Sequence, residues 1–262
     1  MVTPAGARTT SAIEKSAIPR KLRDDAILEA VCQLQFKTTD LPELVIGRLS
    51  LETKWKEFTP HRLPFADIPV PVRSADSNLK TQPTFELRNA DASRIVRLNE
   101  SVMSYHLVGV NKYCGWTQFK PEIAETVGAI FERLQSPEIS RITLRYINAI
   151  HPDRHFINSV HDLELEVRVG GSKVAGSLNL NYVEGTGTNY VTTTRIAHPE
   201  FVQGKLPERI VAVVDVEVTT PPQFSARDLS QAMSWIDDAH THEKQAFFKL
   251  IPPQVLSRLR ED

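Results

Sequence analysis

Arg145 and Asn148 could do chemistry, because they interrupt an otherwise apolar extended segment, RITLRYINAI, at residues 141–150. Alternation along a strand puts Arg145 on one face and Asn148 on the other, apolar face. An unpaired charge in a dry interior is costly, so we expect Arg145 to have an acidic partner. Glu29 is the expected partner, since it lies on the polar side of the alternating segment 26–36. This pairing requires the two segments to lie close together.

Two interpretations of these residues stay open. In the first, Arg145 forms a structural ion pair and Asn148 satisfies a strand end or a turn. In the second, Glu29, Thr143, Arg145 and Asn148 line a cleft that holds a small polar or anionic ligand. A guanidinium group suits that task because its planar fork of donors matches a carboxylate or a phosphate. We favour the first interpretation, since ion pairs of this kind are usually structural.

Histidines and carboxylates gather near the end of the chain, in DDAHTHEK at residues 237–244. Asp238 and His242 are one helical turn apart, a spacing at which a carboxylate and an imidazole can share a metal. The order is not that of the HExxH zinc motif, and His240 and His242 would point about 200° apart on a helix. We therefore expect a helix face in contact with solvent and keep Asp238 and His242 as weak metal candidates.

Two other segments contain residue types found in active sites. HPDRHF, residues 151–156, brings together two histidines that could do acid–base work, although we expect it to turn the chain. EGTGTNY, residues 184–190, lacks the third glycine and the following helix of a phosphate loop, so it predicts a hairpin turn. Neither Ser104 nor Cys114 lies in a recognisable nucleophile motif.

Composition is typical of a globular protein with a real core. The chain has 262 residues, 41% of them hydrophobic and 24% charged, and a formal charge of −1. The basic residues are scattered and do not alternate with aromatic ones, so nucleic acid is an unlikely partner. The two cysteines, the missing signal sequence and the lack of a long apolar run predict a cytoplasmic protein without membrane spans. We expect residues 1–18 to form a flexible tail.

Hydrophobic periodicity predicts an α+β protein. The expected strands cover residues 26–36, 84–89, 93–99, 102–109, 139–150, 162–170, 174–183, 188–197 and 209–218, and the expected helices cover 40–58, 119–136 and 225–251. A long irregular connection is expected over 59–82. Short joints between strands favour an antiparallel sheet packed against a few long helices. We expect a single domain over 19–262, with two packed halves at about 19–150 and 151–262 as the alternative description.

Three segments, DDAILEAVCQLQF, ITLRYINAI and AHTHEKQAFFKLI, resemble in order the motifs of a sporadically distributed bacterial family of uncharacterised proteins of about this length. In that family an early strand reads roughly Pro/Ala-Ile-x-Glu-Ala, a central strand reads Leu-Arg-Tyr-x-Asn, and the last helix ends in a His-rich turn before Ala-Phe. Ala26 stands where the family often has proline. The resemblance spans about Asp24 to Ile251. It implies no established activity, and the patchy distribution implies mobile or defence-associated loci.

Three functions are consistent with these observations. The first is a non-catalytic interaction or regulatory protein, whose partner is another protein, encoded nearby, or a second copy of the chain. The second is a sensor for a small ligand, with a cavity beneath the helix at 225–251 as in helix-grip folds. The third is a hydrolase that uses His151, His155, His240 and His242. No cofactor is expected, and we lean towards a protein that is not an enzyme.

Overall fold

The computed structural model describes residue 19, residues 22–185 and residues 189–259. The expected tail at 1–18 and the middle of the expected turn at 184–190 lie outside the described residues. Among the described helices, none has both the length and the apolar character that a membrane crossing requires.

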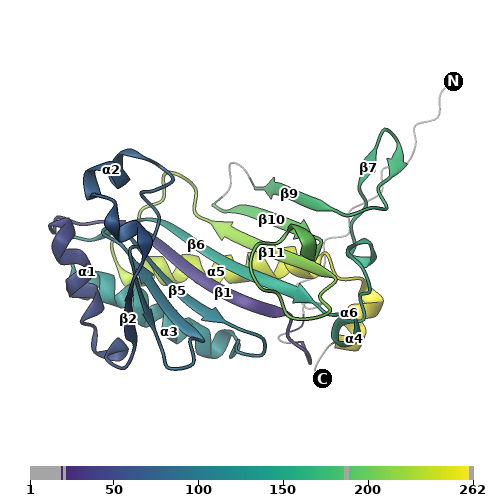
Figure 1. Ribbon diagram of the computed structural model, residues 1–262, viewed down its shortest axis with the longest axis horizontal. Coiled ribbons are helices and arrows are strands. Elements are labelled where there is room, and N and C mark those ends of the chain that lie inside the picture. Colours follow the sequence, from purple (N-terminus) through teal and green to yellow (C-terminus); the bar gives the residue numbers. More distant parts are fainter. Residues whose placement is uncertain (1–18, 20–21, 186–188, 260–262) are drawn as a thin grey trace.

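A nine-stranded antiparallel sheet forms the centre of the molecule (Figure 1). Across the sheet the strands follow the order β2-β3-β4-β5-β1-β6-β11-β10-β9. Their bounds are β1 Ile27–Lys37, β2 Thr59–Arg62, β3 Phe85–Arg88, β4 Arg94–Leu98, β5 Val102–Val108, β6 Glu138–Ile150, β9 Asn179–Glu184, β10 Val191–Ala197 and β11 Ala212–Thr219. A separate hairpin pairs β7 (Arg168–Val169) with β8 (Ser172–Lys173) and projects from the sheet.

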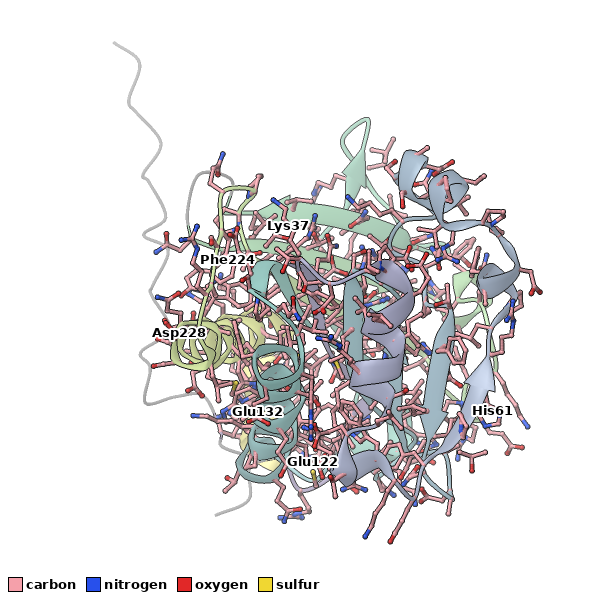
Figure 2. All side chains as sticks on the ribbon, turned by 90° about the vertical axis from the view of Figure 1, so that its left-hand side faces the viewer. Lys37, His61, Glu122, Glu132, Phe224 and Asp228 are labelled. Carbon is pink, nitrogen blue, oxygen red and sulfur yellow. The ribbon has the colours of Figure 1, made fainter. Side chains whose placement is uncertain are left out.

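Two long helices lie on one face of this sheet. They are α3 (Trp116–Arg133) and α5 (Leu229–Phe248), which contact each other, and α5 also packs on β6, β10 and β11. Figure 2 shows both helices on the same side, with Asp228 at the start of α5 and His61 on the distant edge strand β2. The shorter helices are α1 Pro42–Ser50, α2 Val70–Ala75, α4 Pro152–His155, α6 Pro253–Leu259 and the 3₁₀ turns η2 Thr53–Trp55, η3 Pro64–Asp67, η4 Val160–Asp162 and η5 Pro199–Phe201. The expected α+β class, antiparallel sheet and long C-terminal helix are confirmed.

Strand alternation decides which side chains face the helices. In β1 the side chains of Cys32 and Leu34 are buried in the main hydrophobic cluster, and in β6 Leu144 and Tyr146 are buried in the same cluster. Since β1 and β6 are paired, with Cys32 opposite Leu144, the two central strands present one continuous apolar surface to α3 and α5. The expected closeness of these two segments is therefore confirmed.

The long helix α5 begins at a capped residue and keeps one face against the sheet. The Asp228 carboxylate accepts a hydrogen bond of 2.8 Å from the backbone N–H of Gln231, which satisfies a donor that the first helical turn leaves free. The buried side of the helix includes Ile236, Glu243 and Phe247, at helical spacing. Glu243 is therefore a carboxyl group on the core-facing side of an amphipathic helix.

The strand order is nearly symmetrical about the β1–β6 pair. On one side of the pair lie β5, β4 and β3, and on the other lie β11, β10 and β9. Each of these meanders leads into a long helix, α3 or α5. By this order β6 is the first strand of the second half, so the repeated elements favour a division before Glu138. The expected division at residue 150 stays a prediction.

Two early segments differ from the expected elements. The helix expected over 40–58 ends at Ser50, and the 3₁₀ turn η2 follows, which lets Trp55 turn back into the core with 4% of its surface exposed. The irregular connection expected over 59–82 contains the edge strand β2. Pro60 is compatible with that position because an edge strand leaves one side of its ladder unpaired.

The strand expected over 162–170 is reduced to Arg168–Val169. Leu163 is buried and Leu165 packs against a second hydrophobic cluster, formed around the end of α5 and α6. The alternation of leucines here thus serves packing, and no neighbouring strand supplies ladder hydrogen bonds to most of the segment. Periodicity reports which residues are buried, whereas a strand also needs a hydrogen-bonding partner.

Candidate functional site

A cavity of about 660 Å³ lies between α5 and the sheet. It is formed where the two hydrophobic clusters meet along α5, and its volume is in the range of small-molecule sites. Its lining residues come from the entry to β1, the loop before α3, β6 and the second half of α5. They are Leu22, Asp25, Ile27, Tyr113, Cys114, Gly115, Trp116, Thr117, Tyr146, Asn148, His240, Thr241, Glu243, Lys244, Gln245, Phe247 and Phe248.

Local sequence places these side chains around the cavity. Tyr146 and Asn148 are two residues apart in β6, so both point to the face that the helices cover. His240 and Glu243 are three residues apart in α5 and lie on the same side of the helix. The loop before α3 bends at Gly115, whose φ of +85° is a conformation that other residues rarely adopt.

Aromatic rings form one wall of the cavity. The ring of Trp116 stacks on that of His240, with centroids 4.0 Å apart, and the Tyr113 and Tyr146 rings meet edge to face at 5.6 Å. The Tyr146 hydroxyl lies 3.3 Å from that of Tyr113 and 3.5 Å from Nδ1 of His240. The rings therefore surround a short line of hydrogen-bonding atoms, which gives an apolar wall with a few polar positions.

Glu243 is the most unusual group of the cavity. Its residue surface is 4% exposed, and within the described residues its carboxyl group takes part in no hydrogen bond. Nδ1 of His240 lies 4.0 Å from Oε2 of Glu243. Burial raises the pKa of Glu243 to about 8, and Asp25 also raises it, while Lys244 lowers it. The fold therefore holds this carboxyl largely in its neutral form at pH 7.

His240 is held neutral beside it. Burial lowers the pKa of His240 to about 3, and the positive charge of Lys244 lowers it further, while Asp237 acts in the opposite direction. Lys244 donates a hydrogen bond of 2.9 Å from Nζ to the backbone carbonyl of Pro19. A neutral imidazole next to a neutral carboxyl, both in a pocket, is the kind of perturbed pair that marks functional sites.

Asn148, a residue singled out from the sequence, does line this cavity. Its Nδ2 donates a hydrogen bond of 3.2 Å to the carbonyl of Val214, and the residue is 2% exposed. The other three residues of the expected cleft lie on strands β1 and β6 with their side chains on the opposite face of the sheet. The four residues therefore do not line one cleft, because neighbouring positions of a strand alternate between its two faces, and their role in ligand binding stays a prediction.

Arg145 has a different partner from the expected one. Its guanidinium donates two hydrogen bonds to Asp215 of β11, at 2.8 and 2.7 Å, and Arg195 of β10 donates a third to the same carboxylate at 3.0 Å. The hydrogen bond to Asp215 raises the pKa of Arg145. Glu29 contributes to that rise only through its charge. Thr143 contacts the hydroxyl of Thr219 at 3.2 Å. The prediction of an ion-paired arginine holds, whereas the choice of Glu29 as its partner is wrong.

Glu29 belongs instead to a chain of hydrogen bonds on the face of the sheet that α3 and α5 do not cover. We call this the open face, and the face under α3 and α5 the covered face. Its carboxylate lies 2.8 Å from Nδ1 of His106, and Nε2 of His106 lies 2.8 Å from the Ser104 hydroxyl. Burial lowers the pKa of His106, which keeps the imidazole neutral. Burial alone would raise the pKa of Glu29, but the hydrogen bond with His106 and the nearby positive charges of Arg97 and Arg145 together lower it. The serine–histidine–carboxylate order is that of a hydrolase triad.

Access argues against catalysis by this chain of residues. Ser104 is 4% exposed and His106 is 6% exposed, on a strand inside the sheet. A nucleophile needs room for a substrate carbonyl about 3 Å away and for donors to its developing charge. The pairing instead satisfies the buried hydroxyl of Ser104 and the buried imidazole of His106, which would each cost free energy if left alone, through the partly exposed Glu29.

The other histidine candidates do not form a site together. The Tyr190 hydroxyl donates to Asp238 at 3.1 Å, and the His242 ring lies 4.1 Å from the Tyr190 ring. Across the described part of the chain, no group of three potential metal ligands comes together. In α4, His155 accepts a hydrogen bond of 2.8 Å from the backbone N–H of His151, and burial lowers its pKa to about 4. This segment turns the chain, as expected.

Sequence reasoning did not identify Glu243 or Trp116 as site residues. Glu243 occupies an apolar position of the α5 helical pattern. The helical spacing of the sequence could therefore have shown that this carboxyl lies on the buried side of the helix. Trp116 precedes the helix expected at 119–136, whereas α3 begins at Trp116 and contains Pro121 in its interior. Because α3 starts earlier than expected, the indole ring of Trp116 packs against His240 of α5. No local sequence pattern predicts that contact.

Comparisons with known proteins place the chain in no family. No protein-family model matches it, and neither does any curated protein. Among solved structures it is similar to the substrate-free duplicated taurocyamine kinase from Schistosoma mansoni, with 11% identity and a TM-score of 0.41 over 92% of this chain. The same kinase with bound transition state analog components gives 10% identity and a TM-score of 0.41 over 86% of this chain. The chain spans about a third of the length of these structures, 35% and 32%.

Proposed function

We propose that the protein binds a small organic molecule in the cavity beneath α5 and acts as a sensor or regulatory module. The observation that carries the proposal is the buried carboxyl of Glu243, which faces a cavity of about 660 Å³ without a hydrogen-bonding partner among the described residues. A buried polar group without a partner destabilises the folded protein by about 1–3 kcal/mol relative to the unfolded chain. A ligand that pairs with Glu243 would remove that cost.

The position of the cavity supports a role in signalling. Its walls come from segments far apart in the chain, namely the entry to β1, the loop before α3, and α5. A ligand that contacts all three would hold them together, and binding to the folded state alone stabilises it. The expected interaction with another protein, encoded nearby, stays a prediction. In that prediction, a ligand bound in the cavity would be the signal that the partner protein detects. Two cysteines without a disulfide suit a reducing compartment such as the cytoplasm.

Cys114 offers a direct test, because it lines the cavity. The second cysteine, Cys32, is buried, and burial raises its pKa to about 12, so it reacts slowly with thiol reagents. A library of metabolite-sized fragments is screened for compounds that raise the melting temperature. Binders in the cavity should also slow alkylation of Cys114, measured by intact mass. Cys114→Ser is the control that assigns the reacting thiol.

The screen has two clear outcomes. Compounds that both stabilise the protein and protect Cys114 would support the proposal. If no compound protects Cys114, or if every stabilising compound leaves its alkylation rate unchanged, the cavity is not a ligand site.

A further inference from the structure

We infer that the cavity selects an organic cation, an aromatic or aliphatic amine whose ammonium group pairs with the carboxylate of Glu243. This inference rests on the proposed ligand-binding function and names the class of ligand.

The balance of charge in the cavity favours a cation. Among the described residues that line the cavity, the acidic groups are Glu243 and Asp25 and the basic group is Lys244, since His240 is neutral. Lys244 already donates to the carbonyl of Pro19, whereas Glu243 accepts no hydrogen bond within the described residues. An anionic ligand would meet two carboxyl groups, one of them without a donor. An ammonium ligand would supply the donor that Glu243 lacks and balance its charge.

The aromatic wall favours the same class of ligand. Trp116, Tyr113 and Tyr146 lie around the cavity, and aromatic faces attract a cation, most strongly when water is excluded. The stacking of Trp116 on His240 holds the indole ring in place at a centroid distance of 4.0 Å. A carboxylate next to aromatic rings is a combination that recognises amines.

The pairing predicts that ligand binding and proton release are linked. Without a ligand the carboxyl is largely protonated at pH 7, and it must ionise to pair with an ammonium group. The groups that face Glu243 are His240 and Lys244 from α5, Asp25 from the segment before β1, Tyr146 from β6 and Tyr113 from the loop before α3. The affinity for a cation should rise by about tenfold per pH unit below pH 8 until the carboxyl ionises unaided.

Three indole compounds of matched size test the charge preference. Tryptamine is a cation, tryptophol is neutral and indole-3-acetate is an anion at pH 7.5. Affinity is measured by calorimetry and by protection of Cys114 from alkylation. We expect tryptamine to bind at least about tenfold more tightly than tryptophol, and indole-3-acetate more weakly than either.

Glu243→Gln tests the residue, because an amide keeps the size of the side chain and cannot ionise. It should bring tryptamine to within about threefold of tryptophol and remove the pH dependence of tryptamine binding. Glu125→Gln, which changes an exposed carboxyl in the middle of α3, is the matched control and should leave the preference for tryptamine unchanged.

The outcomes separate the two proposals. If tryptophol or indole-3-acetate protects Cys114 as well as tryptamine does, the cavity binds ligands but does not select cations. The cation inference also fails if Glu243→Gln keeps the full preference for tryptamine. If none of the three compounds binds while other fragments protect Cys114, the inference falls and the ligand-binding function stands. If no fragment of any charge protects Cys114, both fall.

Discussion

The two faces of the sheet treat buried carboxyl groups in opposite ways. On the open face, Asp215 accepts hydrogen bonds from Arg145 and Arg195, and Glu86 is paired with Arg97 at 2.6 Å. On the covered face, Glu243 is equally buried but has no ion pair closer than the 4.0 Å contact with His240. On the open face these carboxylates are paired with arginines, whereas on the covered face the carboxyl of Glu243, which lines the cavity, takes part in no hydrogen bond among the described residues.

The pKa values of the glutamates follow this difference. Burial acts to raise the pKa of both Glu86 and Glu243. For Glu86 the hydrogen bonds from Arg97 and Arg88 outweigh burial, so its pKa is lowered and the group stays ionised. For Glu243 burial dominates and the group is held neutral at pH 7. Paired charge indicates architecture, whereas a carboxyl that the fold leaves without a partner indicates a place for a ligand.

The largest expected effect concerns Glu243. Its pKa is higher in the folded protein than in the unfolded chain, so its contribution to stability is complete below about pH 4.5 and is lost as the pH rises through about 8. Glu243→Gln cannot lose this contribution. Relative to the unmodified protein, the variant should gain about 4–5 kcal/mol in unfolding free energy between pH 4 and pH 9. Urea denaturation of both proteins at pH 4 and pH 9 measures this gain. If the variant and the unmodified protein differ in unfolding free energy by the same amount at both pH values, the carboxyl already has a partner.

Acid should destabilise the covered face through His240. Its pKa is lower in the folded protein than in the unfolded chain, so its contribution is complete above about pH 6.5 and is lost as the pH falls towards 3. His240→Gln should reduce the loss of stability between pH 7 and pH 5 by about 2 kcal/mol. His61→Gln, on the exposed edge strand β2, is the control. If both variants lose the same unfolding free energy between pH 7 and pH 5, His240 is protonated as easily in the folded protein as in the unfolded chain.

Removal of Arg145 should weaken the open face to a smaller extent. Arg145→Met should cost about 1–2 kcal/mol, because Asp215 keeps Arg195 as a partner and Arg145 is partly exposed to solvent. Adding Asp215→Asn should cost less than the sum of the single changes, which denaturant titration of the double-mutant cycle measures. Arg141→Met, an exposed position on the same strand and face, is the control. Additive effects would show that the pair is not coupled.

The smallest effect is expected at Ser104. Ser104→Ala should change stability by about 1 kcal/mol or less, because it removes one hydrogen bond to His106. A fluorophosphonate reagent should not label the unmodified protein at Ser104, since the hydroxyl is not accessible to it. A covalent adduct at Ser104, lost in the alanine variant, would instead identify the serine–histidine–glutamate chain as a working nucleophile.

Much of the fold could be predicted from local patterns. The alternation at 26–36 and 139–150 identified the two central strands, and the helical spacing at 225–251 identified α5, since burial on one face leaves a clear period in the sequence. The segment 162–170 shows the limit of this reasoning. Its leucines alternate as in a strand, but whether a strand forms depends on a neighbouring strand, which no local pattern contains.

By itself, the sequence determined the antiparallel sheet, the long final helix and the need of Arg145 for an acidic partner, because each follows from periodicity or from the cost of a buried charge. Only the tertiary structure decided that this partner is Asp215, since strand register sets which side chains meet across the sheet. It alone decided that Asn148 and Glu243 face one cavity. That cavity depends on how α3, α5 and the sheet pack together, which is a property of distant segments and not of any one of them.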